Sequence, residues 1–246
     1  LMRPCLDDRK MPGYTANFPI SAGVASFVAL FAALGLDACA PKAGEIRGPA
    51  SYALEQEAVA ATAPEAPLQI VFDWTARERE ARYTGRGAAR VQQPYRARLD
   101  LFGPRGERYL SAALVDGELR VPTGVARDLV PPPALLWSVL GVFTPPSGAT
   151  LAASDEREGR IRLEYRGAAG DRWRFEIVEG SLRTAEWIES DGSRHTVELS
   201  GDAPAGLPRV AVYRDWAGFN ELTLRLDEVE HVEPFPPEIW EPGAAF

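Results

Sequence analysis

Residues 95–120 read YRARLDLFGPRGERYLSAALVDGELR, and this stretch contains short alternating segments separated by two turns. In the first segment apolar and charged side chains alternate, which is typical of a strand that buries one face. The apolar positions are Tyr95, Ala97, Leu99 and Leu101, and the opposite positions are Arg96, Arg98 and Asp100. Gly103–Gly106 and Asp116-Gly117 have the composition of hairpin turns. The stretch therefore predicts consecutive antiparallel strands.

The same pattern continues on both sides of this stretch. Further strands are expected at 83–91, 150–154, 160–166, 171–178, 182–190, 194–200, 209–215 and 221–232. Residues 68–75 form either another strand or the start of a helix that runs to Arg82. So many consecutive hairpins favour a mainly β domain at 68–246: a curved antiparallel sheet, or half-barrel, of about 10–11 strands.

An apolar segment, ALLWSVLGV at 134–142, interrupts the strands. Pro131-Pro132-Pro133 precede it and Pro145-Pro146 follow it, so a short helix is expected between these breaks. Such a helix can act as a lid over the opening of a half-barrel. Alternation in the strands fits both a packed core and a half-open apolar hollow, and both interpretations stay open.

A leader precedes the strands. Residues 20–36 are uncharged and apolar, and Leu36-Asp37-Ala38-Cys39 resembles a bacterial lipobox in which Asp37 is unusual. Residues 1–38 are therefore expected to be a signal peptide and Cys39 a lipidated residue. Ordinary cleavage after Ala40 and retention as a membrane anchor are the two other interpretations. Residues 39–67, rich in Ala, Pro, Glu and Gly, are expected to be a flexible linker that could include a short helix at 52–61.

Composition excludes several classes of function. The 246 residues carry a net charge of −8, which disfavours nucleic acid as a partner because phosphates bind basic patches. Both cysteines, Cys5 and Cys39, precede the strands, so the domain has neither a disulfide nor a catalytic thiol.

No motif for catalysis or for a cofactor occurs in the sequence. His195 and His231 have no partner at metal-ligand spacing, and the phosphate-loop and serine-hydrolase signatures are absent. Glu186 and Glu189 could form an acid and base pair, but solvated strand positions explain them better. The sequence therefore predicts a protein that is not an enzyme and uses no metal or cofactor.

Several motifs recur together in this chain. They are Gly85-x-Gly87-x-Ala89, Tyr95-Arg96-x-Arg98-Leu99-Asp100-Leu101, Gly103-Pro104-x-Gly106, the Asp116-Gly117 hairpin, an apolar helix of the form Pro-x-x-Leu-x-x-x-Leu-Gly, and Leu207-Pro208 before a strand. With the lipoprotein leader, this set resembles the LolB family of outer-membrane lipoprotein receptors, within the LolA/LolB lipoprotein-carrier superfamily. The likeness covers roughly residues 68–232.

The resemblance implies an eleven-stranded half-barrel whose concave side holds acyl chains beneath a helical lid. The implied lining residues are Leu99, Leu101, Leu110, Ala112, Leu114, Trp173, Phe175, Ile177, Leu222 and Leu224. The implied lid residues are Leu135, Leu136, Val139 and Leu140. The family inserts lipoproteins with a protruding loop that has an apolar tip. This loop corresponds to Pro104, Arg105 and Gly106, and Arg105 departs from the pattern.

These expectations combine into a lipid-anchored periplasmic protein that binds a lipidated or otherwise hydrophobic ligand and accepts or localises lipoproteins at the outer membrane. The expected partners are a lipidated protein or another acyl-chain ligand, a periplasmic carrier protein, and the membrane that holds the N-terminal lipid. Anchoring in the inner membrane and a soluble periplasmic form are the alternative locations. The alternative function is a structural or scaffolding envelope lipoprotein with a filled β-core and no ligand.

Overall fold

A computed structural model describes residues 45–122 and 130–242 of the chain. All the described residues belong to one compact unit, which begins at Glu45. The expected signal peptide at 1–38 and the expected lipidation of Cys39 lie outside the described residues, so both stay predictions.

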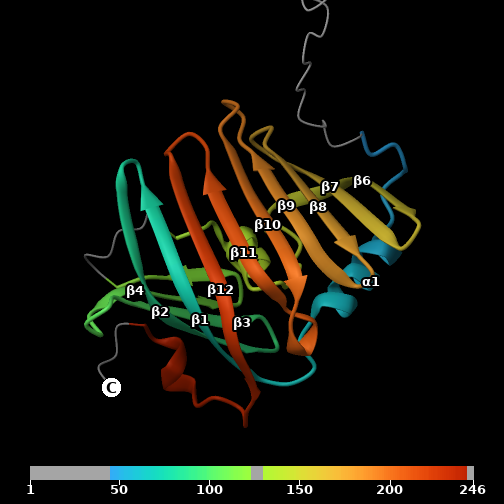
Figure 1. Ribbon diagram of the computed structural model, residues 1–246. Coiled ribbons are helices and arrows are strands. Elements are labelled where there is room, and N and C mark those ends of the chain that lie inside the picture. The colour runs from blue at the N-terminus through green and yellow to red at the C-terminus, as the bar shows by residue number, and fades with distance from the viewer. Residues whose placement is uncertain (1–44, 123–129, 243–246) are drawn as a thin grey trace, which may run out of the picture. The chain divides into compact units, whose positions relative to one another are not determined.

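The described residues form one antiparallel sheet of 12 strands in the order β5-β4-β3-β2-β1-β12-β11-β10-β9-β8-β7-β6 (Figure 1). The strands are β1 (Leu68–Glu78), β2 (Ala81–Gln92), β3 (Arg96–Phe102), β4 (Arg108–Val115), β5 (Glu118–Arg120), β6 (Ala149–Arg157), β7 (Arg160–Gly167), β8 (Arg172–Val178), β9 (Ser181–Ile188), β10 (Arg194–Asp202), β11 (Pro208–Asp215) and β12 (Asn220–His231). Strands β3 and β4 run across the direction of β11 and β12, so the sheet is strongly curved. The expected curved antiparallel sheet is confirmed, with one strand more than the upper expected number.

Strand β1 lies at the middle of the sheet between two meanders. It pairs with β2 on one side, and on the other it pairs with β12 from Leu68 opposite His231 to Glu78 opposite Asn220. Residues 68–75 therefore form a strand, which decides between the two interpretations of that segment. The first and last strands of the chain together make the centre of the sheet.

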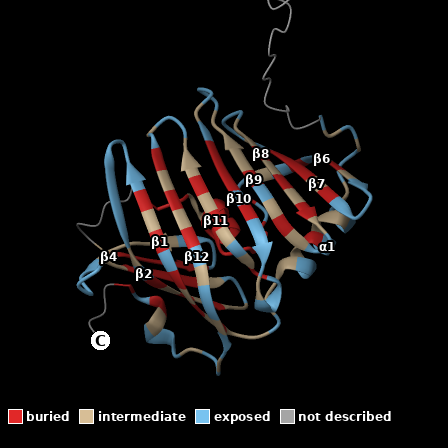
Figure 2. Cartoon of the chain, viewed as in Figure 1, coloured by how far each residue is buried: buried red, intermediate tan, exposed pale blue. Residues whose placement is uncertain are grey.

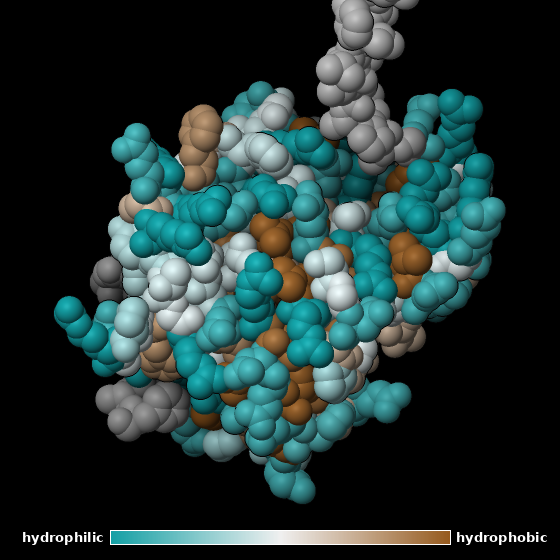
Figure 3. All heavy atoms as spheres, viewed as in Figure 1, coloured by the Kyte–Doolittle hydropathy of each residue, from teal (hydrophilic) through white to brown (hydrophobic). Residues whose placement is uncertain are grey.

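Alternation along the strands builds the core on the concave face. In β1 the buried positions are every second residue, and β8 repeats this pattern with Trp173, Phe175 and Ile177. Figure 2 shows these buried positions as bands that cross neighbouring strands. On the outer face, which Figure 3 turns toward the viewer, hydrophilic side chains predominate and apolar ones form separate patches.

Two α-helices lie against the sheet. The helix α2 (Pro133–Val139) contacts β9, β10 and β11, and α1 (Tyr52–Thr62) contacts β6, β7 and β9. The expected helix at 134–142 is therefore present, although it is shorter. Within the described residues, no helix is both long enough and apolar enough to span a membrane.

The helix α1 corrects part of the expected flexible linker. Ser51 caps its first turn by accepting a hydrogen bond from the Leu54 N–H, and Ala58 is completely buried in the core. Glu55 accepts a hydrogen bond from the Tyr165 hydroxyl of β7 at 2.6 Å. Because these contacts fix the helix on the sheet, residues 52–62 belong to the folded domain.

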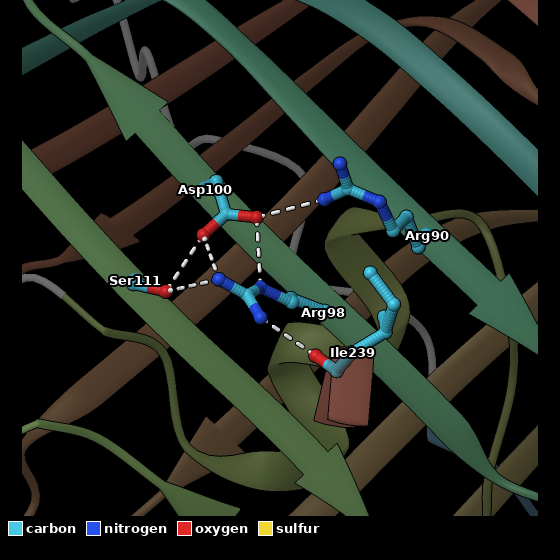
Figure 4. A network of polar contacts seen from close by, with 5 residues as sticks. All are labelled: Arg90, Arg98, Asp100, Ser111 and Ile239. Carbon is cyan, nitrogen blue, oxygen red and sulfur yellow. Dashed lines mark hydrogen bonds and ion pairs between the residues drawn. The ribbon is translucent and has the colours of Figure 1, made fainter. Parts of the chain in front are cut away.

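A buried ion network on the outer face of β3 corrects a second expectation. Arg98 and Asp100 were placed on the solvent side by alternation, yet they are only 2% and 3% exposed. Arg98 donates to both oxygens of Asp100, to Ser111, and to the Ile239 carbonyl at 2.7 Å (Figure 4). Ile239 belongs to the 3-10 helix η3 (Pro237–Trp240), so this segment covers the outer face and removes Arg98 from water.

Candidate functional site: the concave face and its openings

The residues implied to line a hollow all lie in one apolar cluster on the concave face. They are Leu99, Leu101, Leu110, Ala112 and Leu114 from β3 and β4, Trp173, Phe175 and Ile177 from β8, and Leu222 and Leu224 from β12. Each is less than one-tenth exposed. The fold thus brings these residues together from both meanders, although their role in ligand binding stays a prediction.

The expected lid residues also point into this cluster. Leu135, Leu136 and Val139 of α2, and Leu140 after it, are buried. The helix carries no charged residue, and its one hydroxyl, on Ser138, donates to the Ala134 carbonyl at 2.9 Å. Such a helix offers apolar surface on every side, so it behaves as a plug within the curved sheet.

A small cavity lies between α2 and the middle strands of the sheet. Its volume is about 30 Å³, which is roughly the volume of one water molecule. It is lined by Ile70, Phe72, Val139, Leu140, Leu207, Pro208, Ala211, Leu224 and Leu226. Sequence reasoning missed Ile70 and Phe72 because residues 68–75 could have been helical. At this point of the described structure, α2 packs closely against β1, β11 and β12.

Two larger clefts open beside the start of α2. One of about 420 Å³ is lined by Tyr95, Asp116, Gly117, Pro133, Ala134, Trp137, Thr144, Pro145 and Ser147. The other, of about 360 Å³, is lined by Glu78, Arg79, Val130, Pro132, His195, Tyr213, Asp215, Gly218 and Asn220.

A row of aromatic rings crosses four strands near the second cleft. Trp173 stacks on Trp187 with ring centroids 4.8 Å apart, and Trp187 stacks on His195 at 4.9 Å. His195 also bonds to Glu189 at 2.8 Å and to the Tyr213 hydroxyl at 3.1 Å. Burial, helped by the nearby carboxylates of Asp215 and Glu189, raises the pKa of Tyr213 above 10.0. The Tyr213 hydroxyl is therefore held in its neutral form beside His195 to a higher pH than an exposed tyrosine.

The two carboxylates considered as an acid and base pair, Glu186 and Glu189, both have structural partners. Glu186 accepts a hydrogen bond from Arg194 at 2.6 Å, while Glu189 pairs with His195. Among residues 45–122 and 130–242, no group of three His, Cys, Asp or Glu side chains could hold a metal ion.

The loop between β3 and β4 is a tight polar turn. Gly106 donates to the Gly103 carbonyl at 2.9 Å, and the Arg105 N–H donates to the Glu107 carboxylate at 2.9 Å. Pro104, Arg105 and Gly106 are all exposed. The tip therefore presents a charged side chain and contains no apolar group beyond Pro104.

Comparison with solved structures identifies similar folds. No family model matches the sequence, and no curated protein matches it. A LolA superfamily protein from Nitrosomonas europaea is 11% identical with a TM-score of 0.53, covering 78% of this chain and 97% of its own. A putative outer membrane lipoprotein-sorting protein domain from Vibrio parahaemolyticus is 8% identical with a TM-score of 0.45, covering 76% and 94%. At such identities the likeness concerns the fold alone, and the first of the two carries it: the chain has a fold similar to that of a LolA superfamily protein.

Proposed function

We propose that this domain binds the acyl chain of a lipidated protein, or a comparably apolar ligand, on the concave face where α2 now packs. The observation that carries the proposal is the apolar cluster on the concave face of the sheet, to which both meanders contribute and against which the short uncharged helix α2 packs. The likeness in fold to a LolA superfamily protein supports the same class of function.

Exchange of α2 for a ligand is energetically feasible. Exposing the four lid side chains Leu135, Leu136, Val139 and Leu140 would cost roughly 6 to 12 kcal/mol in apolar burial. Burying an acyl chain of about 15 methylene groups would return on the order of 12 kcal/mol. Because the two quantities are similar, a ligand could displace the helix without unfolding the sheet.

The cellular setting of the proposal rests on the leader. A signal peptide at 1–38 and acylation of Cys39 would tether the domain to a membrane of the cell envelope, facing the periplasm. Acceptance of lipoproteins from a periplasmic carrier at the outer membrane, as in the LolB family, is the specific role that we propose. Because Arg105 occupies the loop tip, we do not extend the proposal to insertion of cargo by that loop.

Uptake of a fluorescent acyl probe by the purified full-length chain tests the proposal, together with native mass spectrometry of lipids that co-purify. We expect saturable uptake. Ala211→Leu, which fills the cavity between α2 and β11, should weaken uptake, whereas Ala152→Leu at an exposed position of β6 should not. Wild-type protein that carries no lipid and shows no saturable uptake would refute the proposal.

The second candidate is a scaffolding envelope lipoprotein with a filled core. The small size of the cavity described beneath α2, about 30 Å³, favours it, because ligand pockets usually have a few hundred Å³. The same uptake experiment distinguishes the two candidates. A scaffold with a filled core should bind no acyl probe at probe concentrations that leave the protein folded.

A further inference from the structure

We propose that the tips of the β11–β12 and β1–β2 hairpins form a surface that contacts a lipid bilayer. We call this surface the aromatic tip and define it as Trp216, Phe219, Arg79 and Arg82. It lies outside the hollow and involves none of the residues assigned to ligand binding there. The proposal therefore goes beyond ligand binding and does not depend on it.

The β11–β12 turn holds two large apolar side chains in water. Phe219 is 75% exposed and Trp216 is 51% exposed. The indole N–H of Trp216 already donates to the Thr196 hydroxyl at 3.2 Å, so the exposed part of this ring is apolar. Phe219 is mostly in water and about half of the Trp216 surface is, so the two adjacent rings leave apolar surface that a partner can cover.

The shape of this turn is fixed by hydrogen bonds. One carboxylate oxygen of Asp215 accepts from the N–H groups of Ala217 and Gly218, at 3.0 and 2.9 Å. Phe219 follows with a left-handed backbone, at φ 57°. Because the turn is built in this way, Phe219 is presented outward without a change in the sheet.

The neighbouring β1–β2 tip places the exposed side chains of Arg79 and Arg82 beside the aromatic rings, together with the exposed carboxylates of Glu78 and Glu80. The Arg79 N–H donates to the Phe219 carbonyl at 3.2 Å, which ties the two tips together. Both tips lie at the same end of the sheet in Figure 1. Residues 77–82 read REREAR, a locally net positive segment in a chain of net charge −8. Arg79 and Arg82 are exposed, and no ion pair to either is found among the described residues.

This composition fits the interfacial region of a bilayer. Tryptophan concentrates at the level of the lipid headgroups, and phenylalanine gains by entering the acyl region below it. Arginine side chains beside them can donate hydrogen bonds to lipid phosphates. A protein partner fits less well, because protein interfaces usually bury about 800 Å² per side around a central apolar anchor. Here the two rings stand at the extremity of a narrow hairpin among charged residues.

Contact with a bilayer at this point would also orient the domain. The 360 Å³ cleft beside α2 is lined by Glu78, Arg79, Asp215, Gly218 and Asn220, which belong to the same two hairpins. A membrane bound at the aromatic tip would therefore lie next to that opening of the concave face.

Quenching of tryptophan emission by brominated lipids tests the proposal on the full-length chain. The protein is mixed with phosphatidylcholine vesicles whose acyl chains are brominated or not. Trp216 is the most exposed of the six tryptophans, because the other five are buried or half-buried. We expect brominated vesicles to quench part of the emission, and Trp216→Phe to abolish that part.

Two further variants test whether quenching depends on the aromatic tip or on any exposed aromatic side chain. Phe219→Ser should reduce quenching about twofold or more, because it removes apolar surface that enters the bilayer. Tyr52→Ser is the matched control, since Tyr52 is 60% exposed on α1 and far from the hairpins in sequence. It should leave quenching unchanged.

Equal quenching in the wild type and in Trp216→Phe, or no effect of Phe219→Ser, would overturn the proposal. Circular dichroism establishes that each variant is folded. Uptake of the acyl probe in vesicle-free buffer should be the same in Phe219→Ser as in the wild type. Quenching therefore measures membrane contact, and probe uptake measures ligand binding, so a failure of one can be told from a failure of the other.

Discussion

At the scale of single residues, Arg98 is a charge that the fold has removed from water. Its guanidinium group donates to Asp100, Ser111 and the Ile239 carbonyl, while Arg90 donates at 2.8 Å to Oδ2 of Asp100, which also accepts from Nε of Arg98. A buried ion pair contributes little when intact, but removal of one partner leaves an uncompensated charge. The network therefore acts mainly by requiring η3 to lie on β3.

We expect Arg98→Met to lower the free energy of unfolding by about 3–5 kcal/mol, because Asp100 would remain buried with one basic partner fewer. Urea denaturation followed by circular dichroism measures this loss. Arg86→Met is the control, since Arg86 pairs with Asp227 at the surface and its loss should cost less than about 1 kcal/mol. Similar losses in the two variants would show that burial of Arg98 has no energetic consequence.

Tyr165 gives a prediction for alkaline pH. Burial first, and the hydrogen bond to Glu55 second, raise its pKa above the ordinary value of 10.0. The folded state therefore keeps the phenol proton while the unfolded state releases it above about pH 10. The stabilisation is complete below that pH, and it falls by about 1.4 kcal/mol per pH unit above it.

Unfolding free energies measured between pH 8 and about pH 11.5 should show this decline. Tyr165→Phe should make this decline shallower by about 1.4 kcal/mol per pH unit, while the raised pKa of Tyr213 leaves a remaining slope. Its stability at pH 8 should be lower because Glu55 loses its donor. Tyr83→Phe is a suitable control because Tyr83 is partly exposed and no other group hydrogen-bonds its hydroxyl in the described part of the chain. An unchanged slope in Tyr165→Phe would contradict the assignment.

Alternation in the sequence predicted the inward residues and failed on the outward ones. Leu99 and Leu101 were placed on the apolar face from their spacing alone, and they are buried there. Arg98 and Asp100 were placed in solvent by the same rule. Alternation predicts which face of the sheet a residue lies on. It does not predict that Ile239, 141 positions away in the sequence, covers the outer face at Arg98.

At the scale of elements, α2 is held at its end by one glycine. Gly141 has φ +80°, and a Cβ atom there would lie 2.6 Å from Cδ of Pro208 at the start of β11. The close approach explains why the helix can pack so tightly that a cavity of only about 30 Å³ remains. It also makes the position sensitive to any side chain.

We expect Gly141→Ala to move the end of α2 away from β11 and to increase uptake of the acyl probe. It should also lower the unfolding free energy by at least about 1–2 kcal/mol, the cost of a left-handed alanine. Gly206→Ala is a matched control, because Gly206 has φ +71° and no atom within 4 Å of the added Cβ. It should lose similar stability without a gain in uptake.

The helices show why some elements could be predicted and others could not. The α2 segment is marked by prolines on both sides and by continuous apolar residues, so its position followed from the sequence. The α1 segment is rich in alanine and glutamate, which suits a linker as well as a helix. Its place in the domain depends on Ala58, Glu55 and Thr62, and the last accepts a hydrogen bond from the Phe143 N–H at 3.0 Å. These contacts are long-range, so local composition did not reveal them.

At the scale of the whole molecule, the sheet depends on the pairing of its first and last strands. β12 supplies one complete side of β1, from Leu68 to Glu78. Without β12 the two meanders would share no strand pairing. The domain should therefore unfold as one cooperative unit and not as two halves.

We expect a chain truncated after Phe219, which lacks β12, to show no cooperative thermal transition, because both meanders lose their common partner. A chain truncated after Pro242 removes residues 243–246 alone and should melt like the full-length chain. Differential scanning calorimetry distinguishes the two results. A cooperative transition in the shorter chain would mean that one meander is stable by itself.

The pairing of β1 with β12 also has a consequence for the order in which the chain is synthesised. A ribosome makes β1 early, and nearly the whole domain must follow before β12 exists to join it. Until then the central ladder is incomplete, and the nascent polypeptide cannot acquire its final stability. The proposed leader would direct the chain to a channel that passes unfolded polypeptides. Because the sheet is completed only when β12 is made, the chain would stay unfolded long enough to pass through that channel.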